Sequence, residues 1–595
     1  MAPRIEDYAL VGDCRTGALI STRGDVDWFC APRFDSASIF ASLLGTDDHG
    51  VWRLSPTADD ASATRSYDDG SLVLVTRWET STGIADVYDF MPIDHGRVDL
   101  VRRIVGIAGH VEFATELRMR FDYARAVPWV RQVGDDTGPV LRATAGPDTV
   151  ILRGVAMHPD GNVHRGTFTV EPDITVDLVL TWYHSYKPQP GPLDVDDALD
   201  GTRQWWSEFA DRITHAGPHH EAVVRSLVTL RALSNLDTGG IVAAATTSLP
   251  EQFGGARNWD YRFVWLRDAS LTLQALIAHG MLHVADHWRM WLLRAIAGNT
   301  AELQIVYGIA GERDLLEREL PNLPGYEDSA PVRIGNGAVD QYQADVIGEV
   351  MVALDATRVA GLEEMSLSWS LQRRLLEWVE VNIERPDNGI WEMRGEPKMF
   401  THSRAMMWAA FDRGIRGVED FGLEGSADHW RALADRIRSE IDADGVDPET
   451  GGFVQYHGTT EVDASLLLLP QVGFCAADDP RMLACVAEIE RTLMADGLVK
   501  RYRTDGGVDG LSGQENPFLA CSFWLVWQYA HSGRIDDATA LLDRACATAN
   551  DVGLFSEEYD VQDRRQAGNM PQALSHLAMV TAADAVAENA ANTSK

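Results

Sequence analysis

Lys187-Pro-Gln-Pro-Gly-Pro192 divides this chain of 595 residues into two parts whose hydrophobic residues repeat with different periods. Proline fixes its own backbone and has no amide hydrogen, so three prolines in six residues exclude a helix interior and a central strand. The length and a hydrophobic content of 45% allow more than one domain with a sizeable core. We therefore place a domain boundary at this segment.

The part before the boundary has the pattern of a β-domain. Between Tyr8 and about Tyr186, short runs of β-branched and apolar residues are separated by turn residues, and Ser71–Trp78 and Ile174–Trp182 are two of these runs. The prediction for residues 1–190 is an antiparallel β-sandwich.

Beyond the boundary the apolar residues recur at helical spacing. Residues 191–216 are acidic, and we expect them to form a linking helix. Trp205 and Trp206 would be the side chains through which this helix packs on the rest of the protein. Over residues 217–590 we expect roughly twelve helices, opening at about His219, Asp268, His283, Asp340, Ser366, Thr401, Ala427, Asp463, Pro480, Pro517, Asp536 and Pro571. About six antiparallel helix pairs would close into a helical barrel, with long loops at one end free to build a pocket.

The charge balance narrows the range of partners. Lys and Arg number 52 against 89 Asp and Glu, a formal charge of −37 that is spread along the chain. Such a surface repels nucleic acid and anionic lipid, so we expect neither as a partner. The start of the chain has no apolar run behind basic residues, and no stretch is apolar for long enough to span a bilayer. A cytoplasmic protein is expected.

Two glutamates far apart in sequence form the candidate catalytic pair. Glu392 lies in Gly389-Ile-Trp-Glu-Met-Arg-Gly395 and Glu557 lies in Phe555-Ser-Glu-Glu-Tyr-Asp560, both among aromatic and turn residues where a carboxylate is costly to desolvate. Cleavage of a glycosidic bond requires two carboxyl groups, one to protonate the leaving oxygen and one to act on water or the sugar carbon. Glu515 is a second candidate for the base; it could also favour a helix start or bind sugar hydroxyls as part of a pocket wall.

The segment from Thr246 to Asp268 carries the strongest local pattern. Aromatic side chains recur at every second position, which indicates an extended strand, at Trp259, Tyr261, Phe263 and Trp265. Its opposite face carries Asp260 and Arg262, and a helix begins near Asp268. Aromatic rings stack on pyranose faces while Arg and Asp bind hydroxyls, so the segment suits the closed end of a sugar pocket. A buried aromatic strand with a capped helix is the alternative.

Three motifs in order resemble glycoside hydrolase family 15, the family of glucoamylases, glucodextranases and actinobacterial and archaeal trehalases. They are Arg257–Asp268, Gly389–Glu396 and Ser556–Asp560 with Gly568–Gln572. Gly24–Asp35 resembles a stretch of the bacterial members, so the resemblance covers nearly the whole chain. It implies a β-sandwich followed by an (α/α)6 barrel, and hydrolysis with inversion at the anomeric carbon.

The resemblance also implies roles for single residues. Glu392, directly after Trp391, matches the general acid, and Glu557 matches the general base. Trp265, Arg267 and Asp268 match the residues that hold the terminal glucose, and Arg501 matches an arginine bordering the same subsite. Gln343 and Asp345 fall near a further sugar-contacting loop. Trp391, beside the acid, and Glu515 are candidate substrate-binding residues as well. Met393 and Arg394 depart from the pattern, because glucoamylases often carry a second acidic residue directly after the general acid.

These observations predict an exo-acting, inverting α-glucoside hydrolase that releases glucose from non-reducing ends. The substrate is a small molecule or an oligosaccharide, and trehalose is preferred because neither an export signal nor a starch-binding module is recognised. The alternatives are a glucoamylase or an isomalto- or malto-oligosaccharide glucohydrolase and, as a non-enzyme, an inactive sugar-binding scaffold. We expect no cofactor and no metal site, and the surface is compatible with a monomer or a homo-oligomer. The sequence leaves open the linkage preference and any dependence on phosphate or a divalent ion.

Overall fold

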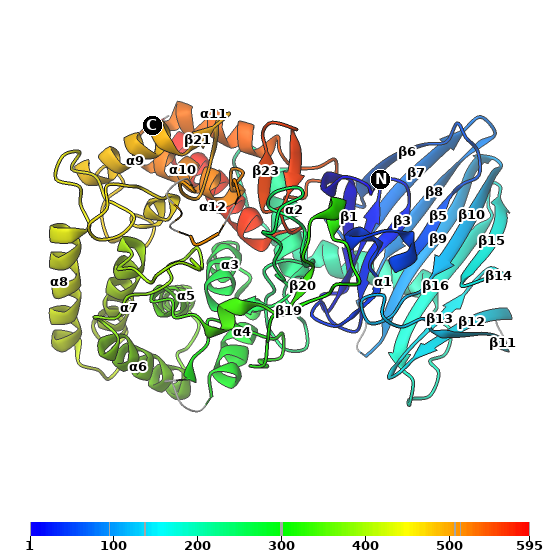
Figure 1. The fold of residues 1–595 in the computed structure, drawn as a ribbon, viewed down its shortest axis with the longest axis horizontal. Coiled ribbons are helices and arrows are strands. Elements are labelled where there is room, and N and C mark those ends of the chain that lie inside the picture. Colours follow the sequence, from blue (N-terminus) through cyan, green and yellow to red (C-terminus); the bar gives the residue numbers. More distant parts are fainter. Residues whose placement is uncertain are drawn as a thin grey trace.

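The computed structural model describes residues 2–593 except 94–95, 136–137, 298–301, 505–506, 508 and 512. Its strands gather at one end of the molecule, and its helices form a rounded assembly at the other end (Figure 1). The fold class is the predicted one, an antiparallel β-sandwich followed by a helical barrel. Among the described residues, no helix is both long enough and apolar enough to cross a membrane.

The sandwich consists of two antiparallel sheets of eight strands each. The first sheet has the order β1-β2-β3-β5-β10-β15-β14, with β4 paired to β3, and its strands are β1 (Tyr8–Gly12), β2 (Gly17–Ser21), β3 (Asp25–Cys30), β4 (Ser38–Phe40), β5 (Val51–Pro56), β10 (Val111–Arg118), β14 (His158–Asp160) and β15 (Val163–Val170). The second has the order β11-β12-β13-β16-β9-β8-β7-β6, with β6 (Ser62–Tyr67), β7 (Leu74–Thr80), β8 (Gly83–Phe90), β9 (Val98–Gly109), β11 (Trp129–Asp135), β12 (Gly138–Ala145), β13 (Asp148–Arg153) and β16 (Thr175–His184).

Alternating side chains explain why the two sheets pack face to face. In β10, Val111, Phe113, Thr115 and Leu117 are buried, while the residues between them are more exposed. A strand places successive side chains on opposite faces, so this alternation gives each sheet one apolar face for the core.

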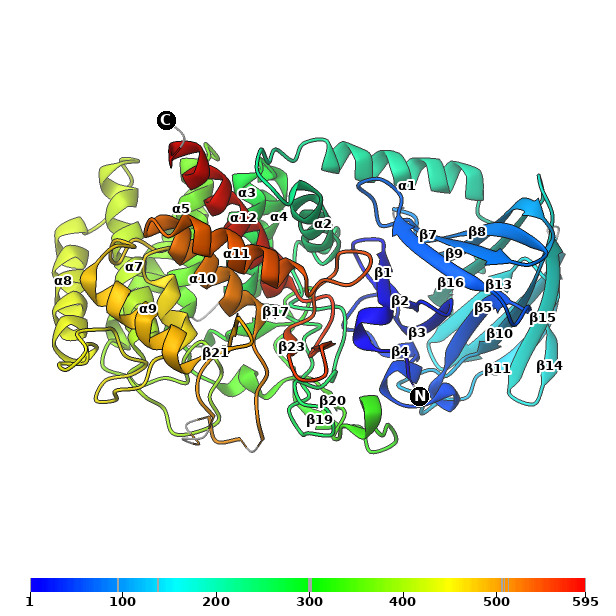
Figure 2. The same ribbon diagram turned by 90° about the horizontal axis from the view of Figure 1, so that it is seen from above.

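Helix α1 (Val195–Ala210) connects the two parts and lies across the junction between them (Figure 2). Asp194 caps its start by accepting a hydrogen bond from the amide of Asp197. Trp206 is fully buried, and the half-buried Trp205 meets its ring edge-on with centroids 4.7 Å apart. The tryptophan pair therefore lies where a docking contact was expected.

The remaining helices form two concentric layers. Contacts join the inner elements in the closed order α3-α5-α7-η7-α10-α12, with bounds α3 (Leu266–Ala278), α5 (Val346–Val359), α7 (Thr401–Glu419), η7 (Ala464–Leu468), α10 (Leu519–His531) and α12 (Ala573–Thr593). The outer elements are α2 (His220–Ala232), α4 (Leu282–Ala295), α6 (Ser366–Val381), α8 (Ala427–Asp444), α9 (Pro480–Thr492) and α11 (Ile535–Cys546). In the described part of the chain, four antiparallel pairs of two-residue or three-residue strands lie in the loops: β17 (Val264–Trp265) with β18 (Val306–Tyr307), β19 (Arg318–Glu319) with β20 (Arg333–Ile334), β21 (Met494–Ala495) with β22 (Leu498–Val499), and β23 (Glu558–Asp560) with β24 (Arg565–Ala567).

Burial distinguishes the two layers. The outer helix α8 buries a single stripe, Trp430, Ala434, Ile437 and Ile441, whose spacing of four and three residues places them on one face. The inner helix α5 is buried around almost its whole circumference. A helix that is apolar all round needs neighbours on every side, and this explains its place inside the ring.

Two of the expected helix starts differ from the structure. The helix expected at about Asp340 begins at Val346, because Gly337–Asp340 forms a separate 3-10 turn capped by Asn336. The segment expected to open a helix at Asp463 is the five-residue 3-10 element η7. Pro470 follows η7 and has no amide hydrogen with which to extend it.

The sandwich packs against the loops that carry the aromatic segment. Arg262 and Asp260 are both buried, bond to each other at 2.7 Å, and Arg262 also donates to the backbone oxygen of Ser36 and to the hydroxyl of Tyr123. Trp28 donates its indole N–H to the backbone oxygen of Ala245 at 3.0 Å. The Asp260 and Arg262 face of the segment therefore anchors the two domains to each other.

Candidate active site

A cavity opens at the loop end of the barrel. Its lining comes from six regions of sequence that the fold brings together, and the residues are Ala243, Glu251, Arg257, Trp259, Tyr261, Trp265, Arg267, Asp268, Asn336, Ala338, Gln341, Ile390, Trp391, Glu392, Arg394, Arg501, Tyr502, Leu511, Phe518, Glu557, Gln572 and Leu574. Charged and aromatic side chains predominate in this list, which is a composition that suits a sugar.

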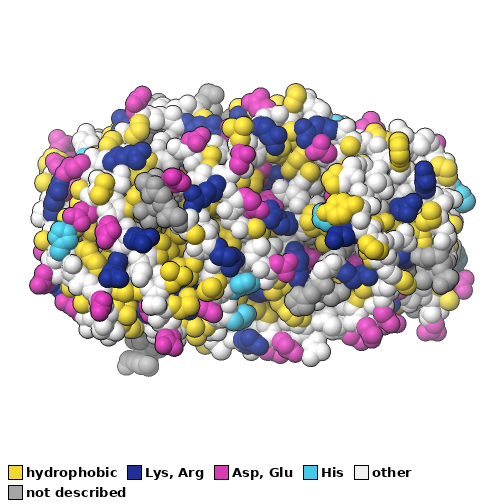
Figure 3. Space-filling view, turned by 90° about the horizontal axis from the view of Figure 1, so that it is seen from below, with side chains coloured by type: hydrophobic (Ala, Val, Ile, Leu, Met, Phe, Trp, Pro, Cys, Tyr) yellow, Lys and Arg dark blue, Asp and Glu magenta, His cyan; other side chains and the backbone are white. Residues whose placement is uncertain are grey.

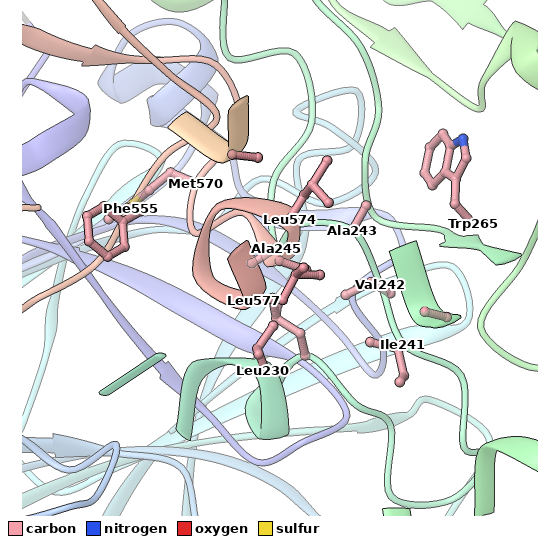
Figure 4. Close-up of a cluster of buried hydrophobic side chains, with 14 of the residues drawn as sticks. Leu230, Ile241, Val242, Ala243, Ala245, Trp265, Phe555, Met570, Leu574 and Leu577 are labelled. Atoms are coloured by element: carbon pink, nitrogen blue, oxygen red, sulfur yellow. The ribbon is translucent and has the colours of Figure 1, made fainter. Parts of the chain in front are cut away.

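The cavity rests on a hydrophobic base. Figure 4 shows Leu230 of α2 and Leu574 and Leu577 of α12 gathered with the segment from Ile241 to Ala245, while Trp265 stands apart from this cluster. Ala243 and Leu574 belong both to the buried cluster and to the lining. Close packing of this kind holds the polar groups above it in fixed positions.

The aromatic segment presents Tyr261 and Trp265 to the cavity as a pair. Their ring centroids are 5.6 Å apart and the rings meet edge-on at 73°. Tyr261 donates its hydroxyl hydrogen to Oε1 of Glu557 at 2.8 Å, and Trp265 donates its indole N–H to Oε1 of Glu392 at 2.6 Å. One short segment therefore holds both candidate catalytic carboxyl groups at the same cavity.

Glu392 sits at the tip of a tight turn after Gly389. Its amide donates to the oxygen of Gly389 at 3.1 Å, and its φ of 57° is in the left-handed region that a non-glycine residue rarely adopts. This conformation costs roughly 1–2 kcal/mol, which the surrounding structure must offset. Strain of this kind is common where a side chain is aimed at a substrate.

Glu392 is one of four carboxyl groups around Arg267. We call this group the Arg267 cluster, and it consists of Arg267, Asp268, Asp345, Glu349 and Glu392. The guanidinium lies 3.1 Å from Asp268 and 3.6 Å from Glu392, and it donates to the backbone oxygen of Ile390 at 2.7 Å. Burial raises the pKa of Glu392 above its usual range, against the opposing effect of Arg267, so burial favours the protonated form.

Glu557 is held in a different environment. Its side chain is 1% exposed, its amide donates to the oxygen of Asn569 at 3.1 Å, and its Oε2 has no hydrogen-bond partner among the described residues. A Cβ on Gly568 would lie 2.6 Å from Glu557, so only glycine fits there. Burial and the nearby Glu251 raise the pKa of Glu557 to about 8, while Arg501 and the Tyr261 hydrogen bond act in the opposite direction.

Glu557 also belongs to a group of four carboxyl groups around one guanidinium. This Arg501 cluster consists of Arg501, Glu251, Glu515, Glu557 and Glu558. Arg501 donates to Glu251 at 2.9 Å and to Glu558 at 3.0 Å, contacts Glu515 through Nε, and lies 3.9 Å from Glu557. Burial raises the pKa of Glu515 to about 6 and that of Glu558 well above its usual range. Arg257 is a second cation near these groups, 4.0 Å from Glu251. Two cations do not balance four buried carboxylates, so the cluster retains protons at neutral pH.

The predicted site residues fall into two groups. Seven of them line the cavity: Glu392, Glu557, Trp265, Arg267, Asp268, Trp391 and Arg501. Glu515, Gln343 and Asp345 are buried and do not belong to the lining. Gln343 accepts a hydrogen bond from Arg267 at 3.4 Å, and Asp345 lies near the same guanidinium, so these two support Arg267 from behind. Glu515 supports Arg501 in the same way.

Several residues that complete the site were not predicted from the sequence. Tyr261 bonds to Glu557, Glu251 and Glu558 bond to Arg501, and Asp463 accepts the indole N–H of Trp391 at 3.2 Å. Tyr261 was visible in the two-residue aromatic pattern, which shows which side chains share a face. No sequence signal pairs Glu251 with Arg501, because 250 residues separate them.

The geometry combines two carboxyl groups with different surroundings at one sugar-sized cavity. Glu392 receives a hydrogen bond from an indole, and its side chain is 23% exposed. Glu557 is more deeply enclosed, and its Oε2 has no hydrogen-bond partner among the described residues. One proton donor and one proton acceptor facing a cavity are the requirements for hydrolysis of a glycosidic bond.

Comparison with known proteins gives a consistent result over the whole chain. The family model described as "Glycosyl hydrolases family 15" matches residues 217–584, and the model "Trehalase-like, N-terminal" matches residues 1–185. A trehalase of Mycolicibacterium smegmatis is 36% identical over 98% of this chain and 91% of its own, and one of Thermoplasma volcanium is 33% identical over 98% and 94%. The structure of a bacterial glucoamylase complexed with acarbose matches 99% of this chain and 94% of its own, with a TM-score of 0.74 at 13% identity, which shows the shared fold.

Proposed function

This chain belongs to glycosyl hydrolase family 15, and we propose that within the family it hydrolyses trehalose to two molecules of glucose. It is a glycoside hydrolase, so the proposal concerns its substrate, its stereochemistry and the roles of its residues. The observation that supports the substrate most strongly is the identity of 33–36% with trehalases over 98% of the chain. The match extends through both the sandwich and the barrel.

In the proposed mechanism, Glu392 is the general acid and Glu557 is the general base. Glu392 gives its proton to the oxygen between the two glucose units as the bond to the anomeric carbon breaks. A water molecule attacks the same carbon from the opposite face and gives its proton to Glu557. The raised pKa of Glu392 supports a protonated acid. Glu557 has a pKa of about 8, so its ionised form is a minority near neutral pH, and that minority is a strong base.

The surrounding residues would position the sugar that is attacked. Trp265, Arg267 and Asp268 line the cavity, and we take them as its enclosed end because the Arg267 side chain is only 9% exposed. A closed end admits only a terminal sugar ring, which supports exo-acting cleavage. Trp391 and Arg501 line the same cavity and would contact the ring from other sides.

This mechanism has a stereochemical consequence that an experiment can test. In trehalose both anomeric carbons are α, so inversion at one of them yields β-glucose from the attacked ring and α-glucose from the leaving ring. We expect fresh product to contain the two anomers in equal amounts when followed by proton NMR before mutarotation. Only α-glucose in the first minutes would mean retention and would contradict the proposed roles.

A second candidate function is hydrolysis of α-glucan or isomaltose-type oligosaccharides. Two observations favour it: the fold match to the bacterial glucoamylase, and 27% identity over 51% of the chain with an isomaltose glucohydrolase of Kribbella flavida. Glucose release should therefore be compared for trehalose, maltose, isomaltose and soluble starch. We expect the highest kcat/KM for trehalose, and release from maltose or starch alone would favour the second candidate.

A further inference from the structure

The two residues directly after the candidate acid Glu392 have different surroundings. Met393 is 1% exposed and packs in a small buried cluster with Phe400 and Tyr502. Arg394 is the next residue and lines the cavity, with 35% of its side chain exposed. Arg394 is therefore the first residue after Glu392 that can reach a bound sugar.

The Arg394 side chain is held in one orientation. Its guanidinium carbon lies 4.2 Å from the centroid of the Trp259 ring, and Nη2 donates to Glu317 at 3.0 Å. A guanidinium stacked on an indole and paired with a carboxylate loses little additional freedom when it binds a ligand. Arg394 is therefore preorganised at the wall of the cavity.

The backbone around Arg394 is fixed as well. The amide of Arg394 donates to the oxygen of Asp509 at 2.9 Å, and the side chain of Asn388 donates to the oxygen of Met393 at 2.8 Å. Gln341 donates to the backbone oxygen of Glu392 at 3.1 Å. The short backbone segment between Glu392 and Arg394 is therefore held in a fixed conformation.

Arg394 retains hydrogen-bonding capacity that its neighbour Arg333 uses up. Among the residues that the structure describes, Nε and Nη1 of Arg394 have no hydrogen-bond partner. Arg333 also lies over Trp259, at 4.6 Å, but its Nη1 donates to the backbone oxygens of Ala256 and Asn258, and it does not line the cavity. Two arginines thus share one aromatic ring, and only Arg394 presents donors to the cavity.

The position of Arg394 also shows which sugar it would meet. The Arg267 side chain at the enclosed end is 9% exposed, whereas that of Arg394 is 35% exposed and so lies towards the mouth. When a terminal ring occupies the enclosed end, the departing ring lies on the mouth side of Glu392. The donors of Arg394 then face the ring that leaves.

We propose that Arg394 determines specificity at the leaving-group side by donating hydrogen bonds to hydroxyls of the departing glucose. The proposal rests on the proposed function, because it takes the substrate to be a disaccharide cleaved between Glu392 and Glu557. Hydrogen bonds from a charged donor to a sugar hydroxyl give directional recognition that an apolar wall lacks. Arg394 thereby favours a departing sugar whose hydroxyl groups are positioned to accept hydrogen bonds from its guanidinium N–H groups.

The test uses a substrate without a departing sugar. In α-glucosyl fluoride the leaving group is fluoride, so contacts to a second ring contribute nothing to its hydrolysis. Arg394→Met keeps the apolar stem but removes the donors, and we expect it to lower kcat/KM for trehalose roughly 10- to 100-fold, as expected for a lost charged hydrogen bond. Hydrolysis of α-glucosyl fluoride should change less than about threefold.

Two further variants give the test its controls. Arg333→Met removes the other arginine over Trp259 and should change kcat/KM for trehalose less than about threefold, because Arg333 does not reach the cavity. Glu317→Gln loosens Arg394 without touching the substrate and should give an intermediate loss on trehalose alone. Glu317→Gln also answers the question if Arg394→Met fails to fold.

The possible outcomes separate this proposal from the proposed function. Equal losses of Arg394→Met on trehalose and on α-glucosyl fluoride would overturn the role of Arg394, and so would no loss on either. If the wild-type enzyme cleaves another disaccharide in place of trehalose, the proposed substrate fails, and the same comparison with α-glucosyl fluoride is made on that disaccharide.

Discussion

The Arg267 cluster and the Arg501 cluster are built to the same plan but differ in how each holds its glutamate at the cavity. Each has one guanidinium and four carboxyl groups, and each is joined to the aromatic segment by one hydrogen bond to that glutamate. Glu392 is on a strained turn, is partly exposed and bonds to an indole. Glu557 is at a bend directly before β23, is enclosed and bonds to a hydroxyl.

The difference shows how similar groups can be given opposite tasks. Partial exposure suits a residue that must reach the oxygen between two sugars. Enclosure with one unpartnered oxygen suits a residue that must receive a proton from a single water. In both clusters burial, together with an excess of carboxyl groups over cations, raises pKa values, so protons are held near neutral pH. The surface shown in Figure 3 is different, because its acidic and basic side chains are interspersed and exposed.

The largest effects are expected when the carboxyl group of each glutamate is replaced by an amide and the substrate's leaving group is varied. This experiment tests directly whether the two clusters have different tasks. We expect Glu392→Gln to lower kcat for trehalose about 10²- to 10⁴-fold, the usual contribution of general acid–base catalysis. It should retain much of its activity on α-glucosyl fluoride, because fluoride leaves without protonation. Glu557→Gln should lower kcat by a similar factor on both substrates. Steady-state kinetics of the two variants measure this pattern, and the same response from both would show that the roles are not divided.

A smaller effect is expected when the donor to each glutamate is removed. Tyr261 is buried and its pKa is raised well above its usual range, so it keeps the proton that it donates to Glu557. This hydrogen bond lowers the pKa of Glu557, so Tyr261→Phe should raise that pKa and move the acidic limb of the kcat/KM profile to higher pH. Trp265→Phe should raise the pKa of Glu392 in the same way and move the alkaline limb.

Tyr261→Phe should lower kcat/KM about tenfold on the acidic limb, since it removes one hydrogen bond to a charged group. Trp265→Phe should instead extend the activity to higher pH, since the acid then keeps its proton over a wider range. Complete pH profiles of the wild type and the two variants supply the measurement. The comparison between the clusters loses its basis if Tyr261→Phe moves the alkaline limb instead.

The smallest effect concerns stability and isolates the Arg267 cluster. Burial and the nearby Asp345 raise the pKa of Glu349 from 4.5 to about 8. Between these values the folded protein keeps a proton that the unfolded chain releases, so this group's contribution to stability is full below pH 4.5 and is lost as pH rises towards 8. Glu349→Gln has no group that titrates here, so it does not lose this stability as pH rises. The difference between its melting temperature and that of the wild type should therefore increase by a few degrees from pH 5 to pH 8.

Glu377→Gln on the exposed face of α6 is the matched control and should show no such change with pH. Thermal unfolding followed by circular dichroism at both pH values supplies the comparison. A constant difference between Glu349→Gln and wild type would mean that Glu349 is ionised throughout this range.

The order of motifs and the change of hydrophobic period were enough to predict the architecture. The proline segment after Tyr186 and the helical spacing beyond Pro218 gave the sandwich and the barrel, because these periods follow directly from the geometry of strands and helices. The starts of most helices were also predicted closely. The prediction of an α-helix after Asp463 was wrong, because a short apolar run does not distinguish an α-helix from a 3-10 helix.

By itself, the sequence identified the two glutamates, the aromatic face and the family resemblance, because these depend on residue types at close spacing. Only the tertiary structure decided which carboxyl groups surround each arginine, that Asp260 and Arg262 face the sandwich, and that Gln343, Asp345 and Glu515 stand behind the cavity wall. The physical reason is that these contacts join residues far apart in the chain, as between Glu251 and Arg501, which are 250 positions apart. Local sequence fixes the face of a strand or helix, whereas packing of the whole chain determines what that face meets.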